Sequence, residues 1–386
     1  MVDAIRKKPT RFAIGLTAGA AARGIDAVLV RIKGSGPGSH IKLVRSKHFP
    51  HSQSLRARML VSRKDAREVA LLSFDLGDAL ADAAEEMQRL AHKELVEVDF
   101  VASAGHTVAH NPARGYETAA VGTLQVGESA VIAERTQLPV VSDFQARDMA
   151  AGGQGGPITT YGDWILFSRP DRTILRLHLG GNTSMTVVSP AFEMITSFDT
   201  GPGMTALDGT VRILTGGTAD LDEDGEAASK GMVIDEFLEY LLDQPFFSKV
   251  PPKSTAYGEF GTEHYLRDAL TGRRVHSFED LTATVTAAVS YSIVRAYNRF
   301  VKPQFGISRV VVSGGGVNNG ALMQRLRNAI PEATFRSSDE YGLPHQCVDA
   351  MAIAILGNET LCGKASNVPH ATGAQKPVPL GRITPA

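Results

Sequence analysis

The sequence predicts an α/β protein of two domains, each built on a mixed sheet, with a cleft between them. The chain has 386 residues, enough for two hydrophobic cores. Each half opens with antiparallel strand patterns and continues with alternating helices and strands, the order typical of α/β domains. A glycine-rich loop at 150–157 lies between the halves. We therefore place the first domain at 1–148 and the second at 149–364, with the tail, about 365–386, packing back on the first.

The first half begins with antiparallel strands. Residues 11–32 predict a strand, a glycine turn and a second strand, and the turn at 34–39 leads into a third strand at 41–49. Apolar residues then recur near the 3.6 spacing of a helix over 54–95. The half ends with an expected strand at 96–103, a helix at 126–137 and a strand at 139–143.

The second half repeats this order. Three strands are expected first, at 173–179, 184–188 and 193–198. Helices follow near 204–215, 225–243, 262–271 and 278–302. The last elements are strand 309–313, helix 319–329, strand 333–336 and helix 346–361.

Composition excludes several classes of function. The 40 basic and 41 acidic side chains balance, so no overall positive field favours nucleic acid or an anionic membrane. Two cysteines, Cys347 and Cys362, give no disulfide framework and fit a reducing compartment. No apolar stretch reaches the roughly 18 residues of a membrane span. We expect a soluble cytoplasmic protein without nucleic-acid or membrane partners.

Asp199 carries the strongest chemical signal. It opens the run Asp-Thr-Gly-Pro-Gly, which predicts a rigid turn presenting one carboxylate. Gly180-Gly181 and Gly314-Gly315-Gly316 each follow a short apolar strand pattern. Glycines at strand ends let backbone N–H groups approach a phosphate closely. The combination indicates phosphoryl transfer, against the alternative of three ordinary tight turns, and we expect these residues to face the cleft.

Three weaker motifs have a structural interpretation beside the functional one. The acidic run 220–225 lacks the bidentate Glu of a calcium loop, and Asp222 or Asp224 capping a helix is the simpler reading. His106 and His110 have zinc spacing but lack the Glu of a metalloprotease helix. Lys253, followed by two hydroxyl residues, either meets a phosphate or lies beside a helix N-cap at Ser254 or Thr255.

Together these segments resemble the anhydro-N-acetylmuramic acid kinases, sugar kinases of the actin-like ATPase superfamily. The resemblance runs from about Phe12 to Gly373. Its carriers include Thr107-Val108, Asp143-Phe144, the loop 152–157, the run 199–203, the segment 252–255 and the triplet 314–316. It implies two actin-like (RNase H-like) domains.

The resemblance also implies a reaction and a set of site residues. ATP with magnesium (Mg²⁺) and water open a 1,6-anhydro sugar and phosphorylate the freed 6-oxygen, and Asp199 is the general base on the water. The small-molecule anhydrosugar would contact Thr107, Arg147 and Asp349. The nucleotide would contact glycines in three turns: Gly15, Gly19, Gly24, Gly180, Gly181, Gly314, Gly315 and Gly316. A homodimer is left open.

The chain departs from the family pattern at the first phosphate turn. The family's Ser-Gly-Thr-Ser-Leu-Asp-Gly is Ala-Gly-Ala-Ala-Ala-Arg-Gly here, residues 18–24. Further differences fall at Gln145, Met204 and Asp349. Each lost charged hydrogen bond typically costs about 1.5–3 kcal/mol. Two hypotheses therefore remain: an active kinase with altered phosphate contacts, and a catalytically inactive homologue that binds a sugar or a protein partner.

Overall fold

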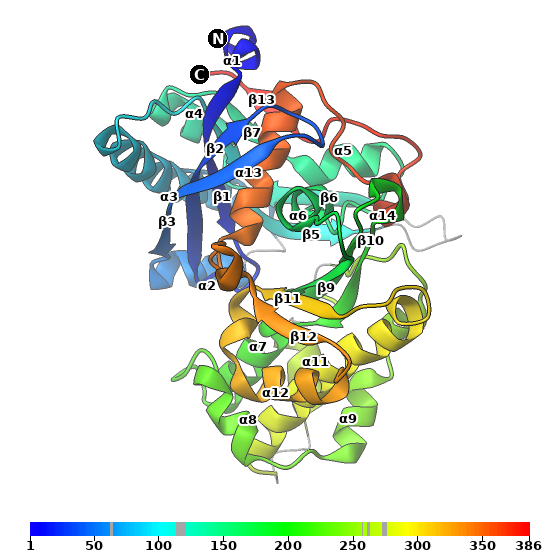
Figure 1. The fold of residues 1–386 in the computed structure, drawn as a ribbon. Coiled ribbons are helices and arrows are strands. Elements are labelled where there is room, and N and C mark those ends of the chain that lie inside the picture. The colour runs from blue at the N-terminus through cyan, green and yellow to red at the C-terminus, as the bar shows by residue number, and fades with distance from the viewer. Residues whose placement is uncertain (62–64, 113–120, 257, 261–262, 272–275) are drawn as a thin grey trace. The chain divides into compact units, whose positions relative to one another are not determined.

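The computed structural model describes residues 1–386 except 62–64, 113–120, 257, 261–262 and 272–275 (Figure 1). Contacts divide the chain into two compact units. Unit 1 contains Met1–Phe167 and Cys347–Ala386, and unit 2 contains Ser168–Gln346. In the part of the chain that is described, no helix is both long and apolar enough to cross a membrane.

Unit 1 is built on a six-stranded sheet in the order β13-β7-β4-β1-β2-β3. The central strand pairs antiparallel with β2 and parallel with β4; Ile14, for example, faces Leu29 on one side and Val101 on the other. A separate hairpin joins β5 to β6. The strands are β1 (Thr10–Ala18), β2 (Gly24–Lys33), β3 (His40–Pro50), β4 (Phe100–Ser103), β5 (His106–Asn111), β6 (Gly122–Val126), β7 (Val140–Ser142) and β13 (Arg382–Thr384).

Two long helices cover this sheet because side chains alternate between the faces of a strand. Ile14 and Leu16 of β1 share a core with Leu76 and Leu80 of α3 (Ala66–Lys93). Gly15, between them, lies against α13 (Val348–Leu361), which contacts β1, β2 and β4 (Figure 1). The other helices are α1 (Val2–Lys7), α2 (Gln53–Val61), α4 (Ser129–Thr136), α5 (Phe144–Ala150), α6 (Thr160–Phe167) and α14 (Pro369–Thr372).

Unit 2 has a five-stranded sheet in the order β10-β9-β8-β11-β12. Leu177 and Val312 of adjacent parallel strands share a core with Val289 and Ile293 of α11 (Phe278–Ala296). The strands are β8 (Ile174–Leu179), β9 (Asn182–Val188), β10 (Thr196–Pro202), β11 (Arg309–Ser313) and β12 (Thr334–Ser337). The helices are α7 (Met204–Leu214), α8 (Glu226–Lys230), α9 (Asp235–Leu242), α10 (Glu263–Leu270), α11 (Phe278–Ala296) and α12 (Gly320–Ala329).

Apart from the added strand β13, the two sheets share one topology. In each, the first strand is central, the second and third follow antiparallel on one side, and two later strands add parallel on the other. The expected α/β class with mixed sheets in two units is confirmed, and this repeated order is the one we expect of actin-like domains.

Several boundaries differ from those expected. The helix at 54–95 is two helices, α2 and α3, and the one at 225–243 is α8 and α9. The helix at 126–137 begins only at Ser129, because 122–126 is strand β6. Helix α6 packs on α13, so the first compact unit ends at Phe167 rather than 148, and the second ends at Gln346 rather than 364. Our division at 148 and 364 stays a prediction about functional domains.

The tail is held by unit 1. The fully buried carboxylate of Asp148 accepts hydrogen bonds from the Gly155 N–H at 2.9 Å and the Thr372 hydroxyl at 2.8 Å. Beyond this point β13 pairs antiparallel with β7. One buried side chain thus fixes the glycine-rich loop and the tail together.

Candidate functional site

Asp199 lies inside strand β10, so the predicted turn at this residue is wrong. The strand continues to Pro202 and carries a bulge between Asp199 and Gly201. Gly201 has a φ of 142°, and a Cβ there would lie 2.8 Å from the ring of Phe247. The glycine therefore lets the strand bend at the point where the carboxylate is presented.

The Asp199 carboxylate is fixed through one oxygen. Its Oδ2 accepts hydrogen bonds from the Thr255 N–H at 2.7 Å, the Thr255 hydroxyl at 2.8 Å and the Ser254 hydroxyl at 3.1 Å. Within the described residues, every hydrogen bond that the carboxylate accepts falls on Oδ2. The Asp199 N–H in turn donates to the Lys253 carbonyl at 3.0 Å.

The electrostatics of Asp199 suit a proton acceptor. Burial raises the pKa of Asp199 above its ordinary value, while the three donors and the positive charge of Lys253 oppose the rise. A base works best when its pKa lies nearer the working pH than that of a free carboxylate. The same residues therefore orient the carboxylate and limit how far burial raises its pKa.

The segment 252–255 supplies the donors that hold Asp199, a role that the sequence analysis did not predict. Residues 253–256 form no helix, so the predicted N-cap at Ser254 or Thr255 is wrong. Both side chains are buried, and both hydroxyls donate to Asp199 instead. The Thr255 hydroxyl also accepts a hydrogen bond from the Asn182 amide at 2.7 Å. Asn182 directly follows Gly181, so this chain of contacts links Asp199 to the first glycine turn of unit 2.

The glycine turns after β8 and β11 lie together, since these two strands are parallel neighbours. Gly314 has a φ of 89°, and a Cβ there would lie 2.6 Å from the carbonyl oxygen of Leu179. A Cβ on Gly316 would lie 2.7 Å from the Leu179 Cβ. Gly315, by contrast, is exposed, with open space where its Cβ would stand.

Helix α7 begins against the same turns. The Gly180 carbonyl accepts from the Met204 N–H at 2.8 Å, and the Gly181 carbonyl accepts from the Thr205 N–H at 3.1 Å. These two carbonyls therefore satisfy the first donors of the helix. Gly315 is the first residue of a 3₁₀ helix, where an N–H has no partner within the helix, and its role as a phosphate contact stays a prediction.

The three glycines predicted at or near the first turn have different surroundings: Gly15 and Gly24 are packed against backbone, and Gly19 is not. A Cβ on Gly15 would lie 2.1 Å from the Ala350 carbonyl oxygen, and one on Gly24 would lie 2.4 Å from the Phe49 carbonyl oxygen. Packing therefore accounts for both glycines. Gly19 is exposed with open space around it, and its carbonyl accepts from the Ala22 N–H at 2.9 Å. Arg23 is half-buried. The hydrogen bond to Asp26 raises the pKa of His48, and the Arg23 charge opposes that rise.

The three predicted sugar contacts lie on different elements of unit 1. Thr107 is on β5, where its hydroxyl accepts from the Gln125 amide at 3.3 Å. Arg147 is exposed on α5, and Asp349 is half-buried in the first turn of α13. Their role as sugar ligands stays a prediction.

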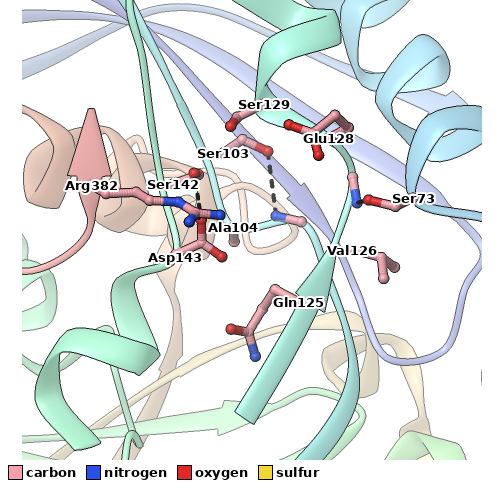
Figure 2. Close-up of a pocket in the computed structure, with 12 residues that line it drawn as sticks. Ser73, Ser103, Ala104, Gln125, Val126, Glu128, Ser129, Ser142, Asp143 and Arg382 are labelled. Carbon is pink, nitrogen blue, oxygen red and sulfur yellow. Dashed lines mark hydrogen bonds and ion pairs between the residues drawn. The ribbon is translucent and has the colours of Figure 1, made fainter. Parts of the chain in front are cut away.

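A small polar cavity opens where β4 and β7 end (Figure 2). Figure 2 shows the Arg382 guanidinium against Asp143, with Nε 2.7 Å from Oδ2. Gln125, which donates to Thr107, also lines the cavity. The volume is about 40 Å³, enough for a few waters but far below the several hundred Å³ of a typical ligand pocket. We therefore do not assign the sugar to this cavity by itself.

The weaker metal motifs take structural roles. Asp222 accepts from the N–H groups of Ala227 and Ala228 at 2.8 and 3.0 Å, which confirms the helix-start interpretation of the acidic run. His106 and His110 lie on strand β5 rather than on a zinc helix. Among the described residues, no group of three or more His, Cys, Asp or Glu side chains is arranged to hold a metal ion.

Sequence reasoning missed the aromatic surroundings of Lys253. Its Nζ lies 4.4 Å from the centroid of the Phe246 ring and 5.6 Å from that of Phe300. The rings come from two separate segments, so no local spacing could have indicated them. Asn182 was missed because it reaches Asp199 only through Thr255.

A repeated mixed α/β unit, glycine turns at the ends of parallel strands and one fixed carboxylate are typical of ATP-dependent sugar kinases of the actin-like class. The family model described as "AnmK: Anhydro-N-acetylmuramic acid kinase" matches residues 11–386. The chain is 36% identical over 392 residues to the anhydro-N-acetylmuramic acid kinase of Caldanaerobacter subterraneus subsp. tengcongensis, covering 98% of each chain. It is also 36% identical over 378 residues to that of Bacillus cereus, covering 96% of this chain and 98% of the relative. The chain belongs to the anhydro-N-acetylmuramic acid kinase family.

Solved structures with some likeness are more distant. Component A of the (R)-2-hydroxyglutaryl-CoA dehydratase of Acidaminococcus fermentans is 12% identical, with a TM-score of 0.44 over 92% of this chain and 99% of that chain. A ROK family glucokinase from Streptomyces griseus, in complex with glucose and AMPPNP, is 12% identical, with a TM-score of 0.39 over 89% and 98%.

Proposed function

We propose that this protein is an active cytoplasmic kinase that uses ATP, Mg²⁺ and water to convert 1,6-anhydro-N-acetylmuramic acid into the ring-opened 6-phosphate. The observation that carries the proposal is the geometry of Asp199, whose Oδ2 is held by three donors of Ser254 and Thr255. Because these donors engage one oxygen, Oδ1 is the atom free to take a proton from water.

In the proposed reaction, Asp199 acts on the attacking water and the glycine turns of unit 2 bind the phosphates. Asp199 Oδ1 accepts a proton from the water whose oxygen attacks the anomeric carbon, and the bond from that carbon to the bridging 6-oxygen breaks. The freed 6-oxygen attacks the γ-phosphorus, and ADP leaves. Gly315 and its neighbouring turns contact the phosphates through backbone N–H groups.

Magnesium would neutralise the charge of the transferring phosphates. Mg²⁺ brought by ATP keeps several waters and needs only one or two protein carboxylates, so the absence of a three-residue metal cluster among the described residues is compatible with it. We assign no ligand to it. The cleft between the two units and the sugar contacts from Thr107, Arg147 and Asp349 stay predictions.

The inactive homologue is the second candidate, and the first turn is what favours it. Ala20 and Ala21 bring no hydroxyl to the turn that the family uses for phosphate. A protein of this kind would bind a sugar or partner without releasing ADP.

Calorimetric titration with ATP plus Mg²⁺, followed by 1,6-anhydro-N-acetylmuramic acid, tests both candidates. We expect both ligands to bind and ADP to appear only when the sugar is present. Sugar binding without sugar-dependent ADP release would support the inactive homologue. The Asp199→Asn protein is the matched control, because asparagine keeps an oxygen to accept the Thr255 N–H.

A further inference from the structure

Lys253 is a buried cation in aromatic surroundings. The residue is only 3% exposed. Its Nζ lies 4.4 Å from the centroid of the Phe246 ring and 5.6 Å from the centroid of the Phe300 ring. Phe246 comes from the 3₁₀ helix Pro245–Ser248, and Phe300 from the π-helical turn Tyr297–Val301. Such rings attract an ammonium group, and the attraction is stronger where the ammonium is desolvated. They favour the charged form in a place where burial opposes it.

The same residue is tied to Asp199 through the backbone. The Lys253 carbonyl accepts the Asp199 N–H at 3.0 Å, and the next two residues donate to Asp199 Oδ2. Phe198, the neighbour of Asp199, meets the Phe300 ring edge-on at 5.7 Å. The segment that carries Lys253 therefore holds the Asp199 carboxylate, and the Phe300 ring lies against Phe198 and near the Lys253 ammonium.

The charges around Lys253 act in opposite directions. Burial lowers the pKa of Lys253 to about 8, and Asp199 partly offsets this fall. Arg299, Lys249 and Arg295 are the other charged groups that act on it, and each lowers the pKa further. Conversely, the Lys253 charge opposes the rise that burial causes in the pKa of Asp199. Asp199 is the group that favours the charged lysine, and the lysine favours the charged Asp199.

We propose that Lys253 is a positioning residue for the reaction, whose ammonium, held by Phe246 and Phe300, supplies the positive charge that compensates the half-buried Asp199 carboxylate. This role rests on the proposed function of Asp199 as the base. Since the base must be ionised, the loss of this charge moves the acid limb of the activity profile to higher pH. A phosphate-binding lysine would instead alter the KM for ATP.

The pH dependence of kcat for the full chain tests this role. In Lys253→Met, an apolar side chain of similar length fills the space between the rings. We expect the acid midpoint of kcat to rise by about one pH unit, since one unit corresponds to a charge interaction of ordinary strength. The rate should fall about tenfold below the midpoint and recover at high pH. Lys253→Arg should keep the wild-type midpoint.

Lys249→Met is the matched control. The Lys249 Nζ also lies over Phe246, at 5.5 Å, yet Lys249 is not among the charges that shift Asp199. This variant should keep the wild-type acid midpoint. A Lys253→Met protein with an unchanged midpoint, or one equally slow at every pH, would overturn the proposal.

A second measurement separates this inference from the proposed function. The ¹³C signal of the Asp199 carboxyl carbon, assigned by its loss in Asp199→Asn, can be followed against pH in the resting protein. We expect its own midpoint and a smaller step near pH 8, where Lys253 loses its proton. This holds even in a protein without kinase activity, and it needs no Lys253 variant to fold. A wild-type signal without the step near pH 8 would contradict the coupling.

Discussion

Thr255 donates two hydrogen bonds to one oxygen of Asp199: its backbone N–H lies 2.7 Å from Oδ2 and its hydroxyl 2.8 Å from the same atom. Two donors from a single residue fix both the position and the rotation of the carboxylate. The bulge between Asp199 and Gly201 shapes the strand that carries the carboxylate, and Ser254 and Thr255 supply its donors.

Asp199→Asn should abolish most sugar turnover and leave ATP affinity nearly unchanged. The amide cannot take a proton from water, and loss of a general base costs roughly 10²–10⁴ in rate. Sugar-dependent ADP release and calorimetric ATP binding measure the two effects separately. A variant that turns over at the wild-type rate would place the base elsewhere.

Thr255→Val should lower kcat about tenfold, while Thr255→Ser keeps most of it. Valine removes the hydroxyl bond to Asp199 and leaves the Asn182 amide without its acceptor, whereas serine retains both contacts. A hydrogen bond to a charged group contributes about 1.5–3 kcal/mol, which corresponds to tenfold or more in rate. Equal rates in the two variants would show that the hydroxyl does not orient the base.

Gly314→Ala should destabilise the protein by about 1–3 kcal/mol, the typical cost of a strained backbone position. The φ of 89° and the 2.6 Å approach to the Leu179 carbonyl oxygen both oppose a Cβ there. Gly315→Ala, in open space, is the matched control and should melt near the wild-type temperature. The melting temperatures of the two variants are the measurement, and an equal loss in both would contradict the distinction.

Gly315→Val tests the phosphate contact itself. The larger side chain should fit without loss of stability yet keep a phosphate away from the Gly315 N–H. We expect ATP affinity to fall about tenfold, the loss of roughly one charge-assisted hydrogen bond. Calorimetric titration gives the affinity, and an unchanged value would remove Gly315 from the nucleotide site.

Ala20→Thr combined with Ala21→Ser should strengthen ATP binding and raise sugar-dependent ADP release. Neither residue is buried, so the hydroxyls restore side-chain donors to the first turn without disturbing the core. Ala20→Val with Ala21→Ser separates the threonine hydroxyl from its bulk. If the threonine protein gains nothing over the valine one, the differences at Gln145, Met204 or Asp349 limit the site instead.

The sequence predicted what depends on local patterns. The apolar run at 309–313 predicted strand β11, and the glycine triplet predicted the turn after it. In the structure Gly314 has a positive φ, which glycine adopts readily. Asp199 was expected in a turn because Gly201 and Pro202 follow it, yet pairing with β9 continues the strand through them. Local residue preference was overruled by a neighbouring strand.

Contacts between distant segments could not be predicted. Gly15 was predicted from its place near the first turn, and that prediction stays open, but no local pattern showed that the backbone of Ala350 packs against it. Phe300 reaches Lys253 only because the π-helical turn after α11 brings the ring there. Such proximity is set by tertiary packing, which spacing in the sequence does not record.

Strand β13 also bears on how the protein behaves in solution. Its residues cover the otherwise unpaired side of β7, and the Thr384 hydroxyl lies 2.8 Å from that of Ser129. Proteolytic cleavage before Arg382 would expose the backbone donors and acceptors along the edge of β7. An exposed strand edge of this kind can pair with another chain and promote aggregation.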